Sequence, residues 1–357
     1  MKNILIVTFS NNADHQDIAF GIFESLYRAK SNDYKICIMG TKSPKVPVIE
    51  TPCTHLVDCP ERPGIEKDTF NLRILINIIK WINKKEFDVI FFESLHTWNI
   101  PIMLLCHKKT KIYQMIHDVI PHKGDKQEKK VHLMNKTVCK LADYIVLCNR
   151  KYIESASNIY GIDHNKLRWV DMWRRFPQYT QPRYTKRILF FGRLNLYKGI
   201  DNLVEIVKKC ANIQFDIVGK VDSQVENDVL ELRAMSNVNM KTGYVSDREM
   251  EDAFINADWV ILPYKSATQS GVIIDGYRYG RPCIAFNVGA VSEQIEDGVS
   301  GYLIKAGDVD AFSQKIMQVV NMGKDDYDNI SQNAYRYGIK KYSSISAKDR
   351  FLKLLDG

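Results

Sequence analysis

The chain is 357 residues long, with 45% hydrophobic and 26% charged residues and a net charge of +8. This composition is typical of a soluble globular protein, and the length suits two domains of about 150 to 200 residues each. No apolar run approaches the roughly 20 residues of a membrane-spanning helix. The first apolar run, Ile4 to Val7, lacks a signal-peptide cleavage region and predicts a first strand.

The positive charge is concentrated in the first half of the sequence. Residues 1–175 contain 27 Lys and Arg against 19 Asp and Glu, whereas residues 176–357 contain 23 of each kind. A basic face of this kind suits an anionic membrane surface, a pyrophosphate-linked lipid or an acidic glycan, and a solvated basic surface is the alternative. The basic residues are not interleaved with a base-stacking motif, so nucleic acid is not an expected partner.

The eight cysteines show neither a CxxC pair nor the mixed Cys/His spacing of a metal site. Cys37, Cys148 and Cys283 lie within apolar runs, which predicts buried free thiols. We therefore expect a reducing, cytoplasmic setting and no structural zinc.

The first half alternates short apolar runs with amphipathic stretches. Asp17–Ala29 and Asp68–Lys85 carry apolar residues at helical spacing. Residues 10–15 are turn-like, and residues 41–66 are rich in proline and polar groups, which predicts an irregular segment. The strands expected here are Asn3–Phe9, Lys35–Met39, Val89–Phe92, Ile112–Ile116 and Tyr144–Leu147. Strands that alternate with helices predict a doubly wound parallel sheet.

The alternation pauses and then restarts in the second half. Met172–Lys186 carries two prolines and no clear period, so it predicts the connection between domains 1–175 and 176–342. The last segment, Ser343–Leu355, has a helical pattern. The strands expected in the second domain are Ile188–Phe191, Phe215–Val218, Val238–Lys241, Trp259–Leu262, Cys283–Phe286 and Tyr302–Ile304. The first strand of the chain does not lead into G-x-G-x-x-G, which counts against a dinucleotide enzyme.

One stretch of the second domain has the pattern of an anion site. A buried strand ends at Pro263, a polar turn follows, and a helix is expected over Val272–Tyr279. Ser270 is a candidate N-cap, and Gly271 allows a ligand to approach the backbone closely. The free N–H groups and the positive dipole end of such a helix favour a bound anion, while an ordinary capped helix is the alternative.

The loop after the first strand of this domain adds two cations. Arg193 and Lys198 lie between Gly192 and Gly199, where the chain passes from a strand into a helix. An Arg fork binds phosphate oxygens bidentately and a Lys adds a point charge, so the two cations together with the helix start at Ser270 and Gly271 can enclose a diphosphate. Two solvated side chains are the simpler alternative for the pair taken alone.

A series of motifs in the second domain resembles the retaining nucleotide-sugar glycosyltransferases of family 4. The motifs are GRLNLYKGIDNL, FDIVGK, NVNMKTGYVSDREMEDAFINADWVILPY, SGVIIDGYRYGRPCIAF and NVGAVSEQIEDGVSGYLI, in the expected order over about 190–310. The first half resembles the family more loosely, through KIYQMIHDVIPH and ADYIVLCNRKYIE. The resemblance implies the α/β fold called GT-B, with two Rossmann-like doubly wound domains facing across a cleft. It implies an acceptor-binding first domain, a donor-binding second domain, and a final helix, residues 343–357, that packs back on the first domain.

The resemblance also implies roles for residues of the second domain. Arg193 and Lys198 would hold the donor diphosphate beside Gly192, with backbone N–H groups of Gly271 and Val272, and no metal or other cofactor would be needed. Asp275 would hydrogen-bond the ribose; a solvent-facing helical carboxylate is its alternative. The nucleobase would be flanked by Val218, Gly219, Tyr244 and Val245.

One position departs from the family pattern. Ala267 stands where the family usually has a Glu near the donor sugar, the first acid of an E-x7-E element whose second acid corresponds to Asp275. The sugar contact would then fall to Thr268, Gln269, Ser270 or backbone groups. This departure leaves open the donor sugar and the possibility of an inactive relative.

The acceptor side is expected in the first domain. His117 and Asp118 end a predicted strand, and in the family a His here often lies beside the transferred sugar; a structural His is the alternative. Asp14 and His15 follow the first strand and can meet an acceptor hydroxyl. Asn11 and Asn12 stand where the family often has a Gly-rich turn.

These observations predict a retaining, metal-independent glycosyltransferase that uses a nucleoside-diphosphate sugar and a glycan or lipid-linked glycan acceptor. Its expected setting is cell-surface polysaccharide biosynthesis, in the cytoplasm or peripherally on the inner face of the membrane. The alternatives are an inactive nucleotide-sugar or glycan-binding relative and a GT-B nucleotide-sugar epimerase.

Overall fold

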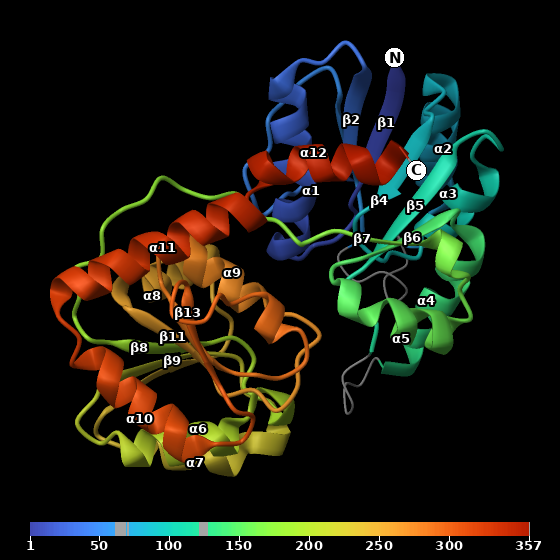
Figure 1. The fold of residues 1–357 in the computed structure, drawn as a ribbon. Helices are drawn as coiled ribbons and strands as arrows, with labels where there is room; N and C mark the ends of the chain where they lie inside the picture. The colour runs from blue at the N-terminus through green and yellow to red at the C-terminus, as the bar shows by residue number, and fades with distance from the viewer. Residues whose placement is uncertain (61–68, 70, 121–127, 357) are drawn as a thin grey trace. The chain divides into compact units, whose positions relative to one another are not determined.

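The computed structural model describes residues 1–60, 69, 71–120 and 128–356. The chain forms two compact units (Figure 1). Unit 1 comprises Met1–Arg175 with Ser343–Gly357, and unit 2 comprises Phe176–Tyr342. Each unit is an α/β domain built on a parallel sheet of its own, which confirms the predicted fold class. Within the described part of the chain, no helix combines the length and the apolar character needed to cross a membrane.

Unit 1 contains a seven-stranded sheet in the order β3-β2-β1-β4-β5-β6-β7, with parallel pairing. Its strands are β1 (Lys2–Val7), β2 (Tyr34–Thr41), β3 (Thr54–Val57), β4 (Val89–Phe92), β5 (Lys111–Ile116), β6 (Tyr144–Leu147) and β7 (Leu167–Trp169). Its helices are α1 (Ala13–Ala29), α2 (Leu72–Lys85), α3 (Asn99–Leu105), α4 (Glu128–Leu141), α5 (Ile153–Tyr160) and α12 (Ser344–Asp356). All four residues of β4 are buried, because helices cover both faces of a doubly wound sheet.

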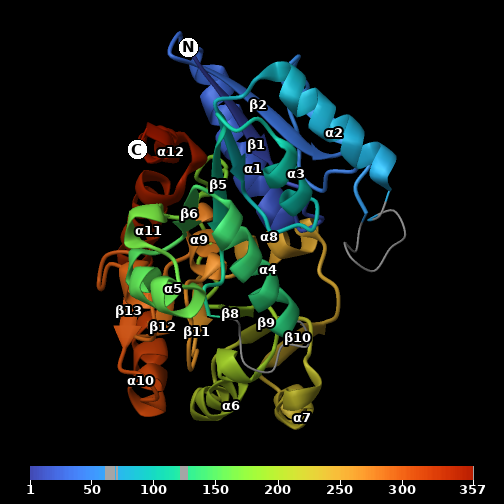
Figure 2. The ribbon, with the colours of Figure 1, turned by 90° about the vertical axis from the view of Figure 1, so that its right-hand side faces the viewer.

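The final helix, α12, belongs to unit 1 although its sequence follows unit 2. It packs on α1, where Ser25 Oγ donates a hydrogen bond of 3.1 Å to Ser344 Oγ. The Phe351 ring lies 4.9 Å from the ring of Phe91 on β4. Figures 1 and 2 show α1 and α12 on one face of the sheet and α2, α3 and α4 on the other.

Unit 2 contains a six-stranded parallel sheet in the order β10-β9-β8-β11-β12-β13. Its strands are β8 (Ile188–Phe191), β9 (Phe215–Gly219), β10 (Val238–Thr242), β11 (Trp259–Leu262), β12 (Cys283–Phe286) and β13 (Gly301–Ile304). Its helices are α6 (Ile200–Lys209), α7 (Glu226–Ala234), α8 (Asp247–Asn256), α9 (Gly271–Arg278), α10 (Val309–Val320) and α11 (Lys324–Tyr342).

Both sheets reverse their strand order at one point, between β1 and β4 in unit 1 and between β8 and β11 in unit 2. The connections leave such a point on opposite faces, so a crevice opens beyond the carboxyl ends of the two strands, where ligands of doubly wound folds bind. The loops after β1 and β4, and after β8 and β11, are therefore the places to look for function.

Three local expectations differ from the structure. Residues 41–66 contain a strand, β3, which pairs with β2; its sequence, THLV, is short and mostly half-buried, so it lacks a recognisable apolar run. Helix α1 begins at Ala13 within the predicted turn, because its first turn is polar and Asn12 caps it by accepting the Asp14 N–H at 2.7 Å. The short edge strand β7 was not predicted.

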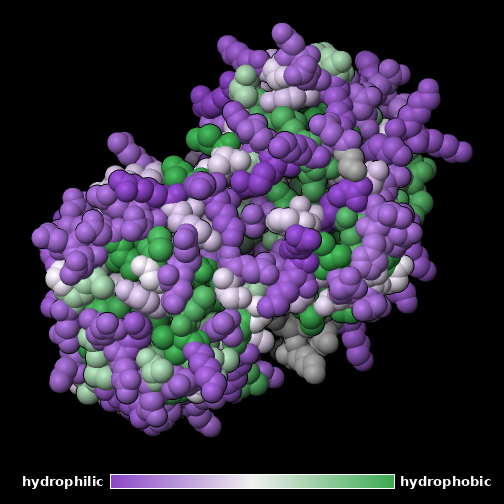
Figure 3. Space-filling view, in the orientation of Figure 1, coloured by the Kyte–Doolittle hydropathy of each residue, from purple (hydrophilic) through white to green (hydrophobic). Residues whose placement is uncertain are grey.

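The predicted free thiols are confirmed, since Cys37, Cys148 and Cys283 are buried and form no disulfide. The surface is largely hydrophilic, but Figure 3 shows hydrophobic side chains at the edge of unit 1 where α2 and α3 lie. Leu72 and Ile76 on α2 are 68% and 47% exposed, and Leu104 and Leu105 on α3 are 61% and 58% exposed.

Candidate active site

Lys198 occupies the centre of the loop that follows β8. The strand ends at Phe191, a short 3-10 turn spans Leu196–Lys198, and Gly199, with a φ of +68°, leads into α6. The Lys198 side chain folds back toward the strand end, so that Nζ lies 3.5 Å from the Phe191 carbonyl oxygen and 5.0 Å from the centre of the Tyr264 ring. The residue is only 8% exposed, which places an ammonium group in a largely desolvated position at the switch point. Arg193, in the same loop, is exposed.

Two glycines make room for this arrangement. Gly192 has a φ of +111°, and a Cβ there would overlap Lys198 Nζ. A Cβ on Gly219, at the end of β9, would overlap the carbonyl oxygen of Gly192. The end of β9 can therefore approach Gly192 only because Gly219 has no side chain, and Lys198 Nζ occupies the space that a side chain on Gly192 would need.

The start of α9 lies beside the same loop. A Cβ on Gly192 would be 3.9 Å from Val272 Cγ2, in the first turn of the helix. The structure places Ser270 at the N-cap position, although its side chain makes no capping hydrogen bond. The first turn contains no acidic residue, so the N–H groups at this helix start remain suited to a bound anion.

The turn before α9 is held by a residue that the sequence analysis did not identify. Gln294 accepts the Ser270 N–H at 2.7 Å through Oε1 and donates through Nε2 to the Ser270 carbonyl oxygen at 3.0 Å. Gln294 is 5% exposed and lies 24 residues further along the chain. No local sequence pattern could have identified Gln294, because its hydrogen-bond partner, Ser270, belongs to a different loop.

The other predicted donor residues also lie at the carboxyl edge of the unit 2 sheet. Asp275 is 4% exposed, and its carboxylate pairs with Arg278 Nη1 at 3.0 Å within α9. Ala267 is buried, and its carbonyl oxygen accepts the Ala290 N–H at 3.2 Å, while Thr268 and Gln269 are partly exposed. The residues predicted to flank the nucleobase lie at the ends of the neighbouring strands β9 and β10. Val218 (buried) and Gly219 are the last two residues of β9, and Tyr244 (80% exposed) and Val245 (half-buried) follow β10.

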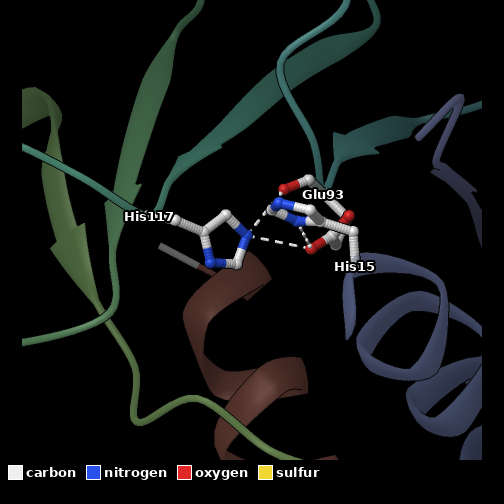
Figure 4. Close-up of side chains that lie close together, drawn as sticks. All are labelled: His15, Glu93 and His117. Carbon is white, nitrogen blue, oxygen red and sulfur yellow. Dashed lines mark hydrogen bonds and ion pairs between the residues drawn. The ribbon is translucent and has the colours of Figure 1, made fainter. Parts of the chain in front are cut away.

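In unit 1, three side chains converge at the carboxyl ends of β1, β4 and β5 (Figure 4). Glu93 follows β4, His117 follows β5, and His15 lies in the first turn of α1. Glu93 Oε1 is 2.9 Å from His15 Nδ1 and 2.9 Å from His117 Nε2, and the Glu93 side chain is completely buried. The structure therefore brings together the predicted residues His15 and His117 through a carboxylate that was not predicted. The signal available in the sequence was an acidic residue directly after a strand that is apolar throughout, FFES.

The cluster shifts the pKa values of its members. Burial raises the pKa of the Glu93 carboxyl, but His15 and His117 outweigh burial and lower it to about 2. Burial also opposes a charged His117 ring, but Cys148 and Glu93 outweigh that effect and raise its pKa well above the ordinary range. Cys148 Sγ lies 3.5 Å from His117 Nδ1.

The same three side chains are the one His/Cys/Asp/Glu group within residues 1–60, 69, 71–120 and 128–356 whose ligand atoms come within 4.8 Å of one another. One imidazole nitrogen of each histidine lies at hydrogen-bonding distance from the same carboxylate oxygen, and an ionised Glu93 accepts a hydrogen bond from each ring.

The other residues predicted on the acceptor side are close in sequence to His15 or His117. Asn12 caps α1, and Asn11 carries a buried Nδ2 that has no partner among the described residues. Asp14 pairs with Arg174 at 3.3 Å, and Asp118 directly follows His117.

A comparison with protein families identifies unit 2. Residues 185–322 match the sequence model described as Glycosyl transferases group 1. Unit 2 contains a group 1 glycosyltransferase domain. The matched residues contain both switch-point loops of unit 2, with Lys198, Gly219 and the start of α9.

Known proteins agree with this assignment. An uncharacterized 41.2 kDa protein in the cps region of Klebsiella pneumoniae is 26% identical over 270 residues, which are 70% of this glycosyltransferase and 72% of the relative. An uncharacterized glycosyltransferase of Methanocaldococcus jannaschii is 26% identical over 135 residues, 37% of this chain and 38% of that protein. The crystal structure of Anabaena HepE in complex with UDP-glucose superimposes with a TM-score of 0.70 at 12% identity, covering both chains completely. The chain therefore has the GT-B fold.

Proposed function

We propose that this group 1 glycosyltransferase is a retaining enzyme of family 4 that transfers a sugar from a nucleoside diphosphate to a hydroxyl group of a glycan or lipid-linked glycan. The observation that carries the proposal is the desolvated Lys198 ammonium beside the start of α9. A fixed cation and a helix N-terminus at one sheet edge form an anion site without a metal ion. Arg193, exposed in the same loop, supplies a second cation to a bound diphosphate.

The chemistry follows from where charge develops. The bond between the anomeric carbon and the diphosphate oxygen breaks, and the acceptor oxygen forms a bond to the same face of that carbon. The acceptor proton passes to the departing phosphate oxygen. Lys198, Arg193 and the α9 amides stabilise the leaving diphosphate, and because its charge grows during bond breaking they bind the transition state more strongly than the ground state.

The choice of nucleotide and pathway rests on relatives. HepE, which shares the fold, was crystallised with UDP-glucose, so UDP is the nucleotide we propose to test first. The relative encoded in a cps region supports a role in cell-surface polysaccharide biosynthesis.

One observation favours a second candidate, a nucleotide-sugar-binding relative without turnover. Ala267 replaces the expected acidic residue and is buried, so no carboxylate is available at that position. Thr268 and Gln269, both partly exposed, are the side chains we propose for the sugar contact instead. Binding of a nucleotide without transfer to any of a broad set of acceptors would support this second candidate.

The first prediction is metal-independent nucleotide binding that depends on Arg193. In calorimetric titrations with EDTA present, we expect one nucleoside diphosphate among UDP, GDP and ADP to bind selectively. Arg193→Ala should weaken that binding about 10- to 100-fold, because one charge-assisted contact to phosphate is lost. Arg248→Ala, which removes an exposed cation of α8, is the matched control and should bind like the unaltered protein. Equal affinity of the Arg193 variant would overturn the diphosphate assignment.

The second prediction concerns a peripheral membrane site on unit 1. The exposed residues Leu72 and Ile76 lie one turn apart on α2, and the same side of the helix continues to Asn83, whose Nδ2 donates to the Leu105 carbonyl oxygen at 3.0 Å. This side therefore leads to the exposed end of α3. Exposed cations lie on the same segments of the chain; they are Arg73, Lys80, Lys84 and Lys85 on α2 and Lys108 and Lys109 after α3. Exposed apolar side chains on a cationic segment fit an anionic lipid surface.

Vesicle co-sedimentation tests this site. We expect binding to phosphatidylglycerol vesicles at low salt, weaker binding at high salt, and little binding to phosphatidylcholine. The double variant Leu72→Ser with Ile76→Ser should bind about ten-fold or more weakly, since two apolar side chains no longer enter the bilayer. Leu230→Ser, at a 63% exposed position on α7 of unit 2, is the matched control. Absence of binding at low salt would refute the membrane site.

A further inference from the structure

Glu93 occupies an unusual position for a carboxylate. It directly follows β4 at the switch point of the unit 1 sheet, and its side chain has no exposed surface. Oε2 accepts a hydrogen bond of 3.2 Å from Thr8 Oγ1. Oε1 accepts hydrogen bonds from both His15 and His117 (Figure 4). Among the described residues, these two imidazoles are its ion-pair partners.

The physics of burial constrains the charge of this cluster. An ionised carboxylate without a positive partner is very costly inside a protein, and here an imidazolium is the compensating charge. An ionised carboxylate has no proton to donate, so His15 Nδ1 and His117 Nε2 are both donors. Glu93 thereby fixes the tautomers and the orientations of both rings.

His117 is the member most fully committed to this arrangement. Its Nε2 lies 2.9 Å from Glu93 Oε1 and 3.1 Å from the Glu93 carbonyl oxygen, and its Nδ1 faces Cys148 Sγ. The His15 ring stands nearly perpendicular to it, at a centroid distance of 4.4 Å. His15 is the more exposed of the two, with 28% of its side chain accessible against 15% for His117.

We propose that Glu93 is a positioning residue of the glycosyltransferase, which holds His117 as an imidazolium so that it acts as a fixed cation and not as a general base. This inference rests on the proposed transferase function. It agrees with the proposed chemistry, in which a phosphate oxygen of the leaving group accepts the acceptor proton, so that the transfer step needs no neutral imidazole.

The groups around His117 determine the expected pH dependence. Glu93 faces it from the end of β4, His15 from α1 and Cys148 from the end of β6, while Asp118 is its neighbour in sequence. Replacing Glu93 by Gln keeps an oxygen that accepts a hydrogen bond but removes the negative charge. The charged ring keeps Cys148 but loses its carboxylate partner in a buried position, so the pKa of His117 falls.

The test is the pH profile of transfer. In the unaltered enzyme the rate should fall only when the pH rises through the raised pKa of His117, and in Glu93→Gln this alkaline limb should move to lower pH by about 1 to 3 units. Asp88→Asn is the matched control, because Asp88 is an exposed acid at the opposite end of β4, where it accepts the Asn3 N–H. Its profile should match that of the unaltered enzyme.

An NMR titration of ring-labelled histidines, assigned with His117→Gln, tests the inference without any transfer reaction. A His117 pKa above 6.5 in the unaltered protein that falls in Glu93→Gln supports the proposal. A His117 pKa at or below 6.5 would overturn it, as would an activity loss in Glu93→Gln that is uniform with pH. If no acceptor reaction is found, the transferase proposal fails while the titration still decides the role of Glu93. Nucleotide affinity should not change in Glu93→Gln, because the donor groups belong to unit 2.

Discussion

Replacing Lys198 with methionine is expected to lower kcat for sugar transfer about 100- to 1000-fold, the effect of removing one preorganised charge that stabilises a leaving group. Lys198 lies largely out of water between the Phe191 carbonyl and the Tyr264 ring, so its ammonium needs no reorganisation when the diphosphate departs. Methionine preserves much of the aliphatic volume, which limits the loss of packing. The measurement is the initial rate of product formation at saturating donor.

Lys265→Met is the matched control for this variant. Lys265 is exposed, and its ammonium pairs with Asp201 at 2.6 Å. It lies three residues after the end of β11, in the neighbouring loop at the same edge of the sheet. Its turnover should stay within about three-fold of the unaltered enzyme, because an exposed pair contributes little. If Lys198→Met retained a similar rate while folding normally, Lys198 would not be part of the catalytic machinery.

The strands that the sequence predicted most accurately are the ones buried on both faces. Val89–Phe92, Tyr144–Leu147, Ile188–Phe191, Trp259–Leu262 and Cys283–Phe286 are strands with these bounds in the structure. Each is a short, fully apolar or nearly apolar run bounded by polar residues, and helices on both sides of the sheet require that pattern. The edge strands β3 and β7 lack it, because one side of an edge strand meets solvent or loops, so their sequences are mixed.

The residues of the candidate site also fall into two groups, those that the sequence could predict and those that it could not. Lys198, Gly192 and the start of α9 belong to local motifs, so the sequence could place them together at one sheet edge. Glu93 and Gln294 could not be identified, because each acts through a partner from another segment. Glu93 binds His15 across 78 residues, and Gln294 binds Ser270 across 24. A sequence pattern records spacing along one element, whereas these contacts depend on which strands are neighbours in the sheet. The assignments of Arg193, Asp275 and the nucleobase residues remain predictions.

Replacing Gly219 with alanine is expected to have the largest structural effect on the donor site. The added Cβ would overlap the Gly192 carbonyl oxygen, and the nearest atoms belong to backbone, so no flexible side chain can move aside. The ends of β8 and β9 would have to separate, at a cost of about 1 to 3 kcal/mol in the free energy of unfolding. Because Gly192 in turn borders Lys198 Nζ, the displacement would move the ammonium away from the diphosphate. We expect both a lower melting temperature and loss of measurable nucleotide binding.

Gly323→Ala separates this effect from the general consequence of replacing a glycine. Gly323 also lies in unit 2, in a connection between helices, and a Cβ there would meet only the Asp326 side chain at 3.6 Å, an ordinary contact. Its nucleotide affinity and melting temperature should therefore match those of the unaltered protein. A Gly219 variant that melted normally and still bound nucleotide would show that β8 and β9 can separate without moving Lys198. The close approach of the two glycines would then be a packing feature of the sheet, and the position of the ammonium would depend on the turn at Leu196–Lys198 alone.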